Sequence, residues 1–390
     1  MNDLKKSQVV IIPEPVEIRE GKGIFEITKK TSLYADNGLK EVREYLQKLF
    51  LPASGWSIPS TAKADEEHSI KLSLNVDAPK IGEEGYILKS NEKEILIKAK
   101  TPTGVFYGIQ TLRQLLPKEI ESQNAISNMK WLVPCITVKD YPRFKWRGFM
   151  LDEARHFMGS EVVKKLLDLM ALHKLNKFHW HLVDDQGWRI QIDKYPKLTE
   201  IGSKRELKPK RGEIENTEEE NIYGGFYAKE EIREIITYAK ERFIEVIPEI
   251  EMPGHSSSAF AAYPELSCSG GPFEVPTRWG IFADVYCPGN EQVYEFLKDV
   301  IDEVIELFPS KIIHIGGDEV PKIRWRSCPK CREKMKKEGI SKVKDLQVLL
   351  TNYFATYLES KGRRLMGWNQ ILDENLAKNA ISQYWFGKVK

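Results

Sequence analysis

The sequence predicts an α/β protein in which a (β/α)₈ barrel, cut short after about six strands, follows a small α+β domain. From Arg147 onward, candidate strands alternate with candidate helices, a pattern typical of a parallel sheet. Polar and aromatic residues gather where those strands end, at the edge where such barrels place their active sites. The expected domains are therefore 1–140, the α+β unit, and 141–390, a barrel that lacks its C-terminal strands.

The first domain is predicted from short alternating strands at 71–76, 86–90 and 94–99. A polar turn separates the last two strands, which indicates a hairpin. A helix is expected over 103–116, because apolar residues recur there at helical spacing and Pro117 follows.

The second domain is predicted from strands and helices in alternation. The expected strands are 148–153, 177–183, 243–250, 311–317, 363–368 and 380–386. The expected helices between them are 160–170, 229–242, 291–304 and 342–361, and the polar stretch 203–225 is expected to be a long surface loop. Six strands leave two open sheet edges, so we expect this chain alone to be poorly soluble or to form homo-oligomers.

Composition limits the classes of function. The 390 residues are 41% hydrophobic and 30% charged with net charge +2, which gives no reason to expect a nucleic-acid partner. No stretch approaches the ~20 apolar residues of a membrane span, so no membrane partner is expected. The start, MNDLKKSQVVIIPEP, has too short an apolar run for a secretory signal. The sequence as written indicates a cytoplasmic protein, or a secreted or periplasmic one whose signal was removed.

The segment KIIHIGGDEV (311–320) reads as a buried strand that ends in a glycine pair and two adjacent carboxylates, Asp318 and Glu319. Neighbouring strand residues face opposite ways, so one site can use both only if the backbone turns, which Gly316 and Gly317 permit. Like charges close together disfavour ionisation, so one carboxyl group of such a pair can keep its proton and act as a general acid. The alternative is a solvated loop.

The strand ends together suit a sugar. Charged groups bind hydroxyls, and tryptophan faces stack on pyranose rings. Five of the nine tryptophans fall in or beside the predicted strands: 146, 180, 188, 368 and 385. A rival hypothesis is a zinc-dependent hydrolase that uses His179 and His181, which share a strand face. That hypothesis leaves the two adjacent carboxylates unexplained.

Five cysteines are scattered along the chain, an odd and sparse count that argues against a disulfide scaffold. Cys328 and Cys331 form a single CxxC, which is weak evidence for zinc without a second such motif. Cys268 and Cys287 could pair, although nothing in the sequence requires it.

Six motifs together resemble glycoside hydrolase family 20, the β-N-acetylhexosaminidases, in the order of that family and over nearly the whole chain. They are RGFMLDEARHF (147–157), FHWHLVDDQGWRI (178–190), PEIEMPGH (248–255), HIGGDE (314–319), GWNQIL (367–372) and QYW (383–385). The resemblance implies a retaining exo-glycosidase whose nucleophile is the 2-acetamido oxygen of the substrate, through an oxazolinium intermediate. The implied partner is an oligosaccharide or glycoconjugate ending in N-acetylglucosamine or N-acetylgalactosamine, and no cofactor or catalytic metal is implied.

The resemblance also implies roles for single residues. Glu319 matches the general acid, and Asp318 matches the residue that holds the acetamido N–H. Arg147 matches the residue that binds sugar hydroxyls, and Asp184 and His255 match a supporting pair near the acid. Two aromatic walls of the sugar pocket match Trp368 and Trp385.

The chain departs from the family pattern at several places. The family's last strands supply a Tyr, a further Trp and a Trp-x-Glu segment, none of which has a counterpart here. Gln370 stands where the family often has Glu, and Glu251 where it often has Asp. An inactive fragment or a carbohydrate-binding pseudoenzyme is therefore the second hypothesis, and the zinc hydrolase is the third.

Overall fold

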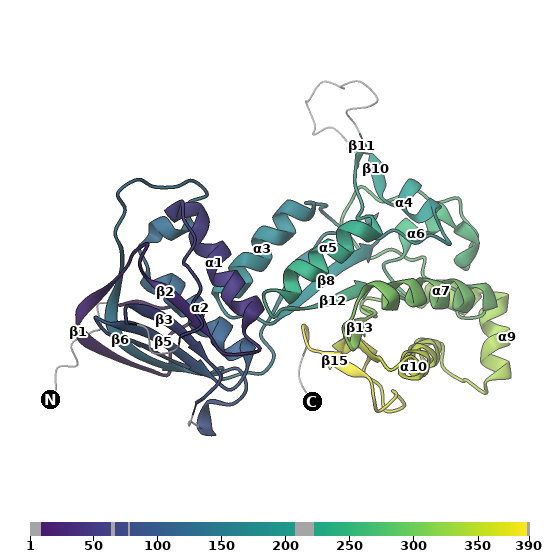
Figure 1. Ribbon diagram of the computed structural model, residues 1–390. Helices are drawn as coiled ribbons and strands as arrows, with labels where there is room; N and C mark the ends of the chain where they lie inside the picture. Colours follow the sequence, from purple (N-terminus) through teal and green to yellow (C-terminus); the bar gives the residue numbers. More distant parts are fainter. Residues whose placement is uncertain (1–8, 64–66, 77–78, 207–221, 388–390) are drawn as a thin grey trace. The chain divides into compact units, whose positions relative to one another are not determined.

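The computed structural model describes residues 9–63, 67–76, 79–206 and 222–387, and the chain divides into two compact units (Figure 1). The first unit is Met1–Arg147, Leu166–Asn176 and Tyr238–Ile244. The second unit is Gly148–Lys165, Lys177–Thr237 and Glu245–Lys390.

The first unit contains a six-stranded sheet of order β1-β6-β4-β5-β3-β2. Its strands are β1 (Glu17–Ile27), β2 (Ser32–Ala35), β3 (Ser69–Ser73), β4 (Tyr86–Ser90), β5 (Glu94–Ala99) and β6 (Trp131–Asp140). The antiparallel pairing of β4 with β5 confirms the predicted hairpin.

Two helices pack on this sheet, α1 (Lys40–Ser54) and α2 (Pro102–Leu115), and short 3₁₀ turns lie at Pro79–Ile81 and Lys118–Glu121. The predicted helix 103–116 corresponds to α2. The Thr101 side chain accepts a hydrogen bond from the Gly104 N–H and caps the start of that helix. A Cβ atom at Gly108 would lie 2.4 Å from Ile97 Cγ2, so glycine is what lets α2 lie directly on β5.

The second unit contains a parallel sheet of order β15-β14-β13-β12-β8-β7, with the short β9 antiparallel to β8. These strands are β7 (Gly148–Asp152), β8 (Lys177–Asp184), β9 (Gly187–Trp188), β12 (Glu245–Ile250), β13 (Ile312–His314), β14 (Arg364–Trp368) and β15 (Ile381–Gln383). All six predicted strands are therefore present and parallel. Within the described residues, β7 and β15 each pair with one neighbour, so they form the two edges of a partial barrel.

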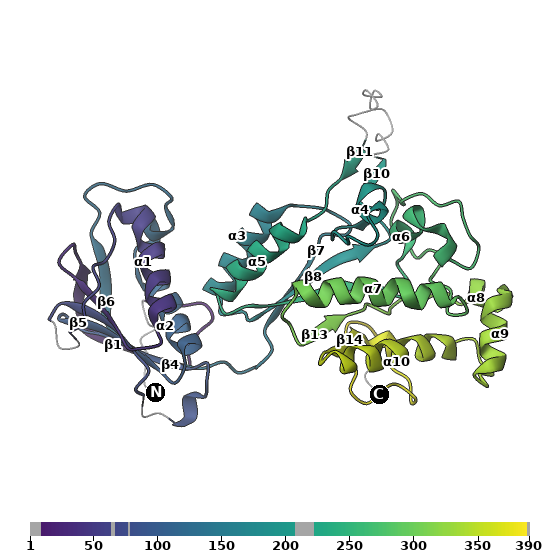
Figure 2. The ribbon, with the colours of Figure 1, turned by 45° about the vertical axis from the view of Figure 1, so that its right-hand side comes forward.

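The predicted helices of the second half correspond to α3 (Ser160–Leu172), α5 (Lys229–Lys240), α7 (Glu291–Leu307) and α10 (Asp345–Ser360). Shorter helices were not predicted: α4 (Lys197–Glu200), α6 (Ser257–Ala262), α8 (Ile323–Ser327) and α9 (Pro329–Lys337), with 3₁₀ turns at Pro264–Leu266 and Asn369–Ile371. The Asn290 side chain accepts a hydrogen bond from Gln292 N–H and starts α7. Figure 2 shows α7 and α10 side by side near β13 and β14, and the Tyr294 ring of α7 contacts Tyr353 and Phe354 of α10.

The prediction of one long loop over 203–225 was wrong at its two ends. β10 (Lys204–Glu206) and β11 (Ile222–Gly224) pair antiparallel, and the intervening 207–221 lie outside the described residues. Among the helices that the structure describes, none is long and apolar enough to cross a membrane.

Candidate active site

The chain turns sharply after β13. Gly316 and Gly317 have φ angles of +65° and +86°, which glycine adopts without steric cost, and Glu319 itself has φ of +47°. Positive φ is uncommon for a residue with a side chain, and such strain clusters at functional sites. The predicted turn at the glycine pair is therefore present.

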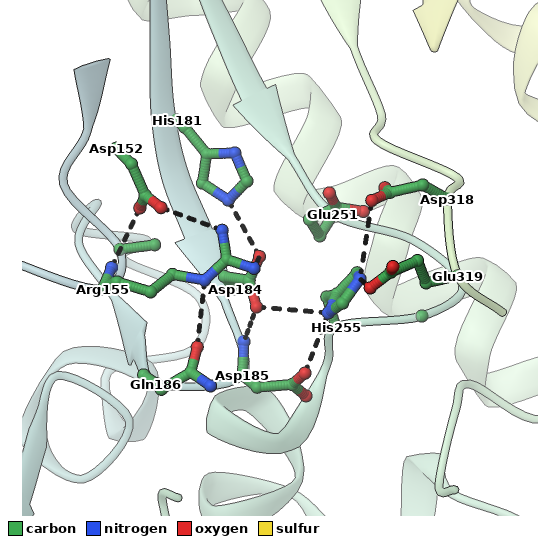
Figure 3. A network of polar contacts seen from close by, with 12 residues as sticks. Asp152, Arg155, His181, Asp184, Asp185, Gln186, Glu251, His255, Asp318 and Glu319 are labelled. Atoms are coloured by element: carbon green, nitrogen blue, oxygen red, sulfur yellow. Dashed lines mark hydrogen bonds and ion pairs between the residues drawn. The ribbon is translucent and has the colours of Figure 1, made fainter. Parts of the chain in front are cut away.

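This turn brings both neighbouring carboxylates to one imidazole ring (Figure 3). His255 Nε2 lies 3.6 Å from Asp318 Oδ2 and 3.7 Å from Glu319 Oε2. These are ion-pair distances, longer than a good hydrogen bond. The Glu319 side chain is 32% exposed and that of Asp318 is 14% exposed, so the outer carboxyl group is the more accessible one.

The other ring nitrogen of His255 faces two more carboxylates. Nδ1 lies 2.9 Å from Asp185 Oδ2 and 3.3 Å from Asp184 Oδ1. Asp185 is held in turn by the N–H and hydroxyl groups of Ser257, at 3.0 and 2.6 Å. Burial would lower the pKa of His255, but Asp184, Asp185 and Asp318 outweigh it and raise that pKa well above its ordinary value. His255 is therefore an imidazolium fixed between two pairs of carboxyl groups.

Asp184 is completely buried at the end of β8, yet it is the centre of several charged contacts. It lies 2.6 Å from Arg155 Nη2 and 3.1 Å from His181 Nε2. Burial would raise the pKa of Asp184, but hydrogen bonds to His181 and His255 and the charge of Arg155 hold it well below its ordinary value. Asp184 therefore stays ionised and anchors His255.

Arg155 follows the carboxyl end of β7 and is fixed from several sides. Its Nη1 lies 2.9 Å from Asp152 Oδ2, and its Nε donates to Gln186 Oε1 at 3.0 Å. The guanidinium carbon also lies 5.0 Å from the ring centroid of Trp279. The rim of the sheet thus carries a positioned arginine beside the carboxylate cluster.

The arginine expected from the sequence, Arg147, is not in this cluster. Arg147 precedes the amino end of β7, and its Nη1 and Nη2 lie 3.0 Å from the two carboxylate oxygens of Glu84. It also donates to Tyr107 Oη and to the carbonyl of Lys174, all within the first unit. Because parallel strands place their site at their carboxyl ends, the structure brings Arg155, and not Arg147, to the rim.

Below the rim, one buried carboxylate collects side chains from three other strands. Glu249 of β12 lies 2.7 Å from His179 Nε2, 2.7 Å from His181 Nδ1 and 3.0 Å from His314 Nδ1. The indole N–H of Trp368 donates to it at 2.8 Å. Burial would raise the pKa of Glu249, but His181, His314 and His179 hold it well below its ordinary value.

These contacts bear on the zinc hypothesis for His179 and His181. His179 with Glu249 and His314, and separately His181 with Glu249 and Glu251, offer atoms that a metal could bind. Nitrogen and oxygen ligands of one tetrahedral zinc would lie about 3.3 Å apart, since each bond is about 2.0 Å. The contacts of Glu249 with His179 and His181, at 2.7 Å, are shorter than that and are the distances of close ion pairs. The geometry therefore fits an ion-paired network better than a metal centre.

Glu251 is a second buried carboxyl group beside the turn. It is 1% exposed, and the Gly317 N–H donates to its Oε2 at 3.2 Å. Burial, together with the negative charges of Asp318 and Glu249, raises the pKa of Glu251 well above its ordinary value. The surroundings of Glu251 thus favour its protonated form, in which it adds no negative charge beside Asp318.

The aromatic residues divide into rim and core. Trp368 and Trp385 lie together, with ring centroids 6.1 Å apart at 62°, and Trp385 is 46% exposed. Trp180 and Trp188 are completely buried, so those two belong to the core and not to a sugar platform. Gln370, which follows Trp368, accepts a hydrogen bond from the backbone N–H of Glu319 at 3.2 Å.

The structure thus brings together Asp184, His255, Asp318 and Glu319, places Trp368 and Trp385 in contact, and leaves Arg147 apart. Sequence reasoning gave no role to Arg155, Asp185 or Glu249. Strand direction was the signal that could have found Arg155, because Arg155 comes after β7 and Arg147 comes before it.

A partial parallel barrel with paired carboxylates, a fixed arginine and tryptophans at its carboxyl edge is typical of glycoside hydrolases. The profile described as "Glycosyl hydrolase family 20, catalytic domain" matches residues 144–390, and that of "Glycosyl hydrolase family 20, domain 2" matches residues 8–141. The chain belongs to glycosyl hydrolase family 20.

Individual relatives agree with this assignment. The chain is 43% identical over 380 residues to a beta-hexosaminidase of Porphyromonas gingivalis, covering 97% of this chain and 47% of that protein. It is 37% identical over 385 residues to a beta-hexosaminidase of Vibrio furnissii, covering 97% of this chain and 60% of that one. The chain therefore spans about half to three fifths of the length of these two relatives.

Solved structures are similar as well. The beta-N-acetylhexosaminidase of Bacteroides fragilis matches with a TM-score of 0.82 and 34% identity, over 97% of this chain and 70% of that one. A mutant Streptomyces plicatus beta-hexosaminidase in complex with product (GlcNAc) matches with a TM-score of 0.80 and 34% identity, over 96% of this chain and 68% of that one.

Proposed function

We propose that this chain carries the acid–base machinery of a retaining exo-β-N-acetylhexosaminidase that works by substrate assistance. The substrate would be a terminal, non-reducing N-acetylglucosamine or N-acetylgalactosamine. The observation that carries the proposal is the position of Asp318 and Glu319, two adjacent carboxyl groups that reach the same ring nitrogen of His255. Membership of family 20 supports it, as do relatives named beta-hexosaminidase.

In the proposed first step, the acetamido oxygen of the substrate attacks C1, and the bond from C1 to the leaving oxygen breaks. Glu319, the more exposed carboxyl group, gives its proton to that oxygen, and an oxazolinium ion forms. In the second step, Glu319 takes a proton from water, which attacks C1 from the face the leaving group occupied, and the bond from C1 to the acetamido oxygen breaks. Two displacements at one carbon give retention of configuration.

Asp318 would orient the acetamido group. Its Oδ1 is buried and has no hydrogen-bond partner among the described residues, so it is available to accept the acetamido N–H. A buried acceptor of this kind is costly unless it is paired, which favours a bound donor. The charge of Asp318 would also stabilise the positive charge that develops on the ring.

Substrate binding would use the rim. We assign the hydroxyl-binding role to Arg155 in place of Arg147, because only Arg155 lies with the carboxylate cluster. Trp368 and Trp385 would contact the apolar face of the sugar. Asp184 and His255 would keep Asp318 and Glu319 in position through the ion pairs already described.

The test compares 4-nitrophenyl N-acetyl-β-glucosaminide with 4-nitrophenyl β-glucoside, which lacks the acetamido group. The proposal expects cleavage of the first alone, at a rate that falls as fluorine atoms are added to the acetyl methyl group and its oxygen becomes less nucleophilic. Equal cleavage of the two glycosides, or a rate insensitive to fluorine, would contradict substrate assistance. No cleavage, with calorimetric binding of N-acetylglucosamine retained, would support the pseudoenzyme instead.

A further inference from the structure

Four of the five cysteines, scattered over more than sixty residues of sequence, meet at one place in the second unit. Cys268 and Cys287 lie between β12 and α7, whereas Cys328 and Cys331 lie at the start of α9. One sulfur atom from each residue lies within 4.8 Å of the other three. The CxxC that was weak evidence alone is therefore joined by two thiols from a separate segment.

The spacing of the sulfur atoms fits a single tetrahedral ion. Cys287 Sγ lies 3.5 Å from Cys331 Sγ and 3.7 Å from Cys328 Sγ, and Cys268 Sγ lies 3.7 Å from Cys331 Sγ. Four thiolates around one zinc would lie about 3.8 Å apart, since each Zn–S bond is about 2.3 Å. Disulfide sulfur atoms are about 2.0 Å apart, so no pair here is at bonding distance.

The surroundings are those of a closed structural site. Cys287 and Cys331 are completely buried, Cys328 is 6% exposed, and only Cys268 is partly open to solvent. The backbone of Gly289 hydrogen-bonds the sulfur atoms of Cys287 and Cys331. Such N–H donors offset the negative charge of metal-bound thiolates.

The segment that contains Cys287 and the segment that contains Cys328 and Cys331 also pack closely against each other. A Cβ atom at Gly289 would lie 2.2 Å from the carbonyl carbon of Lys330, between the two cysteines of the CxxC. A glycine is therefore required where the Cys287 segment approaches α9. Nearby, the Trp325 indole N–H donates to the carbonyl of Tyr286 at 3.0 Å, which joins the same two segments again.

We propose that Cys268, Cys287, Cys328 and Cys331 bind one zinc ion as a structural Cys₄ site. Zinc displaces up to four thiol protons and leaves a tetrathiolate complex of charge −2, with no change in oxidation state. The ion would tie the segment after β12, which contains His255, to the segment after β13, which contains Asp318 and Glu319. Zinc here would hold the two halves of the carboxylate cluster in register without taking part in the reaction.

The first test measures metal in the purified chain. Mass spectrometry of the metal content should give one zinc per chain after gel filtration in metal-free buffer. A thiol-specific mercurial should release that zinc in step with four thiols, followed with a colorimetric zinc indicator. Cobalt substitution should give the charge-transfer and d–d bands of tetrahedral thiolate coordination, which a site of histidines and carboxylates would not give.

Variants locate the site. Cys331→Ser should lower the bound zinc at least tenfold and lower the Tm, whereas Cys135→Ser should keep one zinc per chain. Cys135 is the matched control, because it is a buried cysteine in β6 of the first unit. If Cys331→Ser does not fold, the mercurial and cobalt measurements on the unaltered chain decide the question.

Three outcomes would overturn the proposal. One is a folded chain that stays free of metal after incubation with equimolar zinc. Another is an intact mass reduced by two or four daltons, with disulfides among these four cysteines. The third is iron in place of zinc as the bound metal. None of these outcomes depends on glycosidase activity, so they leave the proposed function to its own test.

Discussion

Gly316 leaves the space that the carboxyl group of Glu251 fills: a Cβ atom at position 316 would lie 1.7 Å from Glu251 Oε2 and 1.9 Å from its Cδ. The φ of Gly316, +65°, is also unfavourable for any residue with a side chain. Gly316→Ala should therefore lower the free energy of unfolding by about 2–5 kcal/mol, from backbone strain together with overpacking.

Denaturant unfolding checks this prediction, and Gly362→Ala is its control. Gly362 has nearly the same φ, +69°, but an added Cβ would meet nothing within 4 Å. Its substitution should cost only about 1 kcal/mol, the penalty of the left-handed backbone. Equal losses in the two variants would mean that the contact with Glu251 does not matter.

Glu319→Gln removes the proposed proton donor and keeps the shape of the side chain. General acid catalysis is typically worth ~10²–10⁴-fold, so kcat/KM should fall by that amount on glycosides with poor leaving groups. The loss should be much smaller on dinitrophenyl glycosides, whose leaving group needs no proton. Steady-state kinetics on both substrates tests this, and an equal loss on both would argue against Glu319 as the acid.

Asp318→Asn keeps the volume of the side chain but removes the charge that would orient the acetamido group. We expect kcat to fall by about 10²–10³-fold on N-acetyl substrates, even though Glu319 is intact. The proper comparison is the ratio of wild-type to variant kcat across the fluorinated N-acyl series. A variant as fast as the wild type would remove Asp318 from the mechanism.

Two arginine variants distinguish a substrate-binding role at the rim from a structural role in the first unit. Arg155→Lys should raise KM by about 10–100-fold, because a hydrogen bond to a charged group contributes about 1.5–3 kcal/mol. Arg147→Lys should leave KM within about twofold of the wild type and instead lower stability, since Arg147 pairs with Glu84 and Tyr107. Kinetics and thermal unfolding of both variants test the assignment, and the opposite pattern would restore Arg147 to the site.

Stability should also depend on His181 and pH. Burial would lower the pKa of His181, but Glu249 and Asp184 raise it from 6.5 to about 10. The raised value means that the folded state favours the proton, so this contribution is complete below pH 6.5 and is lost as the pH rises to about 10. The free energy of unfolding of the wild type should fall across that window more steeply than that of His181→Gln. Urea unfolding of both proteins at several pH values tests this. If His181 were neutral, the free energy of unfolding would change with pH equally in the wild type and in His181→Gln.

The strand positions of the second unit could be predicted because each strand is a short apolar run followed by polar residues at a turn. The α+β unit was predicted less completely: β1, β2, α1 and β6 were not assigned, although the helix over 103–116 was. Within β1, exposed residues outnumber buried ones, so its burial does not alternate in the period of two that marks a half-buried strand.

The turn that joins Asp318 and Glu319 could be predicted, because one motif contains both carboxylates and the two glycines that permit it. The contacts of Arg155 could not be predicted, because its partner is distant in sequence. Arg155 and Asp184 are 29 residues apart and meet only because β7 and β8 are adjacent and parallel. The grouping of the four cysteines could not be predicted for the same reason, because Cys268 and Cys287 belong to no motif.

Glu249 has a consequence for folding as well as for the site. It lies opposite His181 in the register of β8 and opposite His314 in that of β13, and it also accepts from Trp368 of β14. A slip of β12 by one residue would turn this carboxylate toward the helices, so three histidines would lose their ion-pair contact and the indole its acceptor. Burying an unpaired charge costs several kcal/mol, so each misregistered sheet is disfavoured. Glu249 thus favours one alignment during assembly, because it contacts all four of these side chains only when the four strands are in their native register.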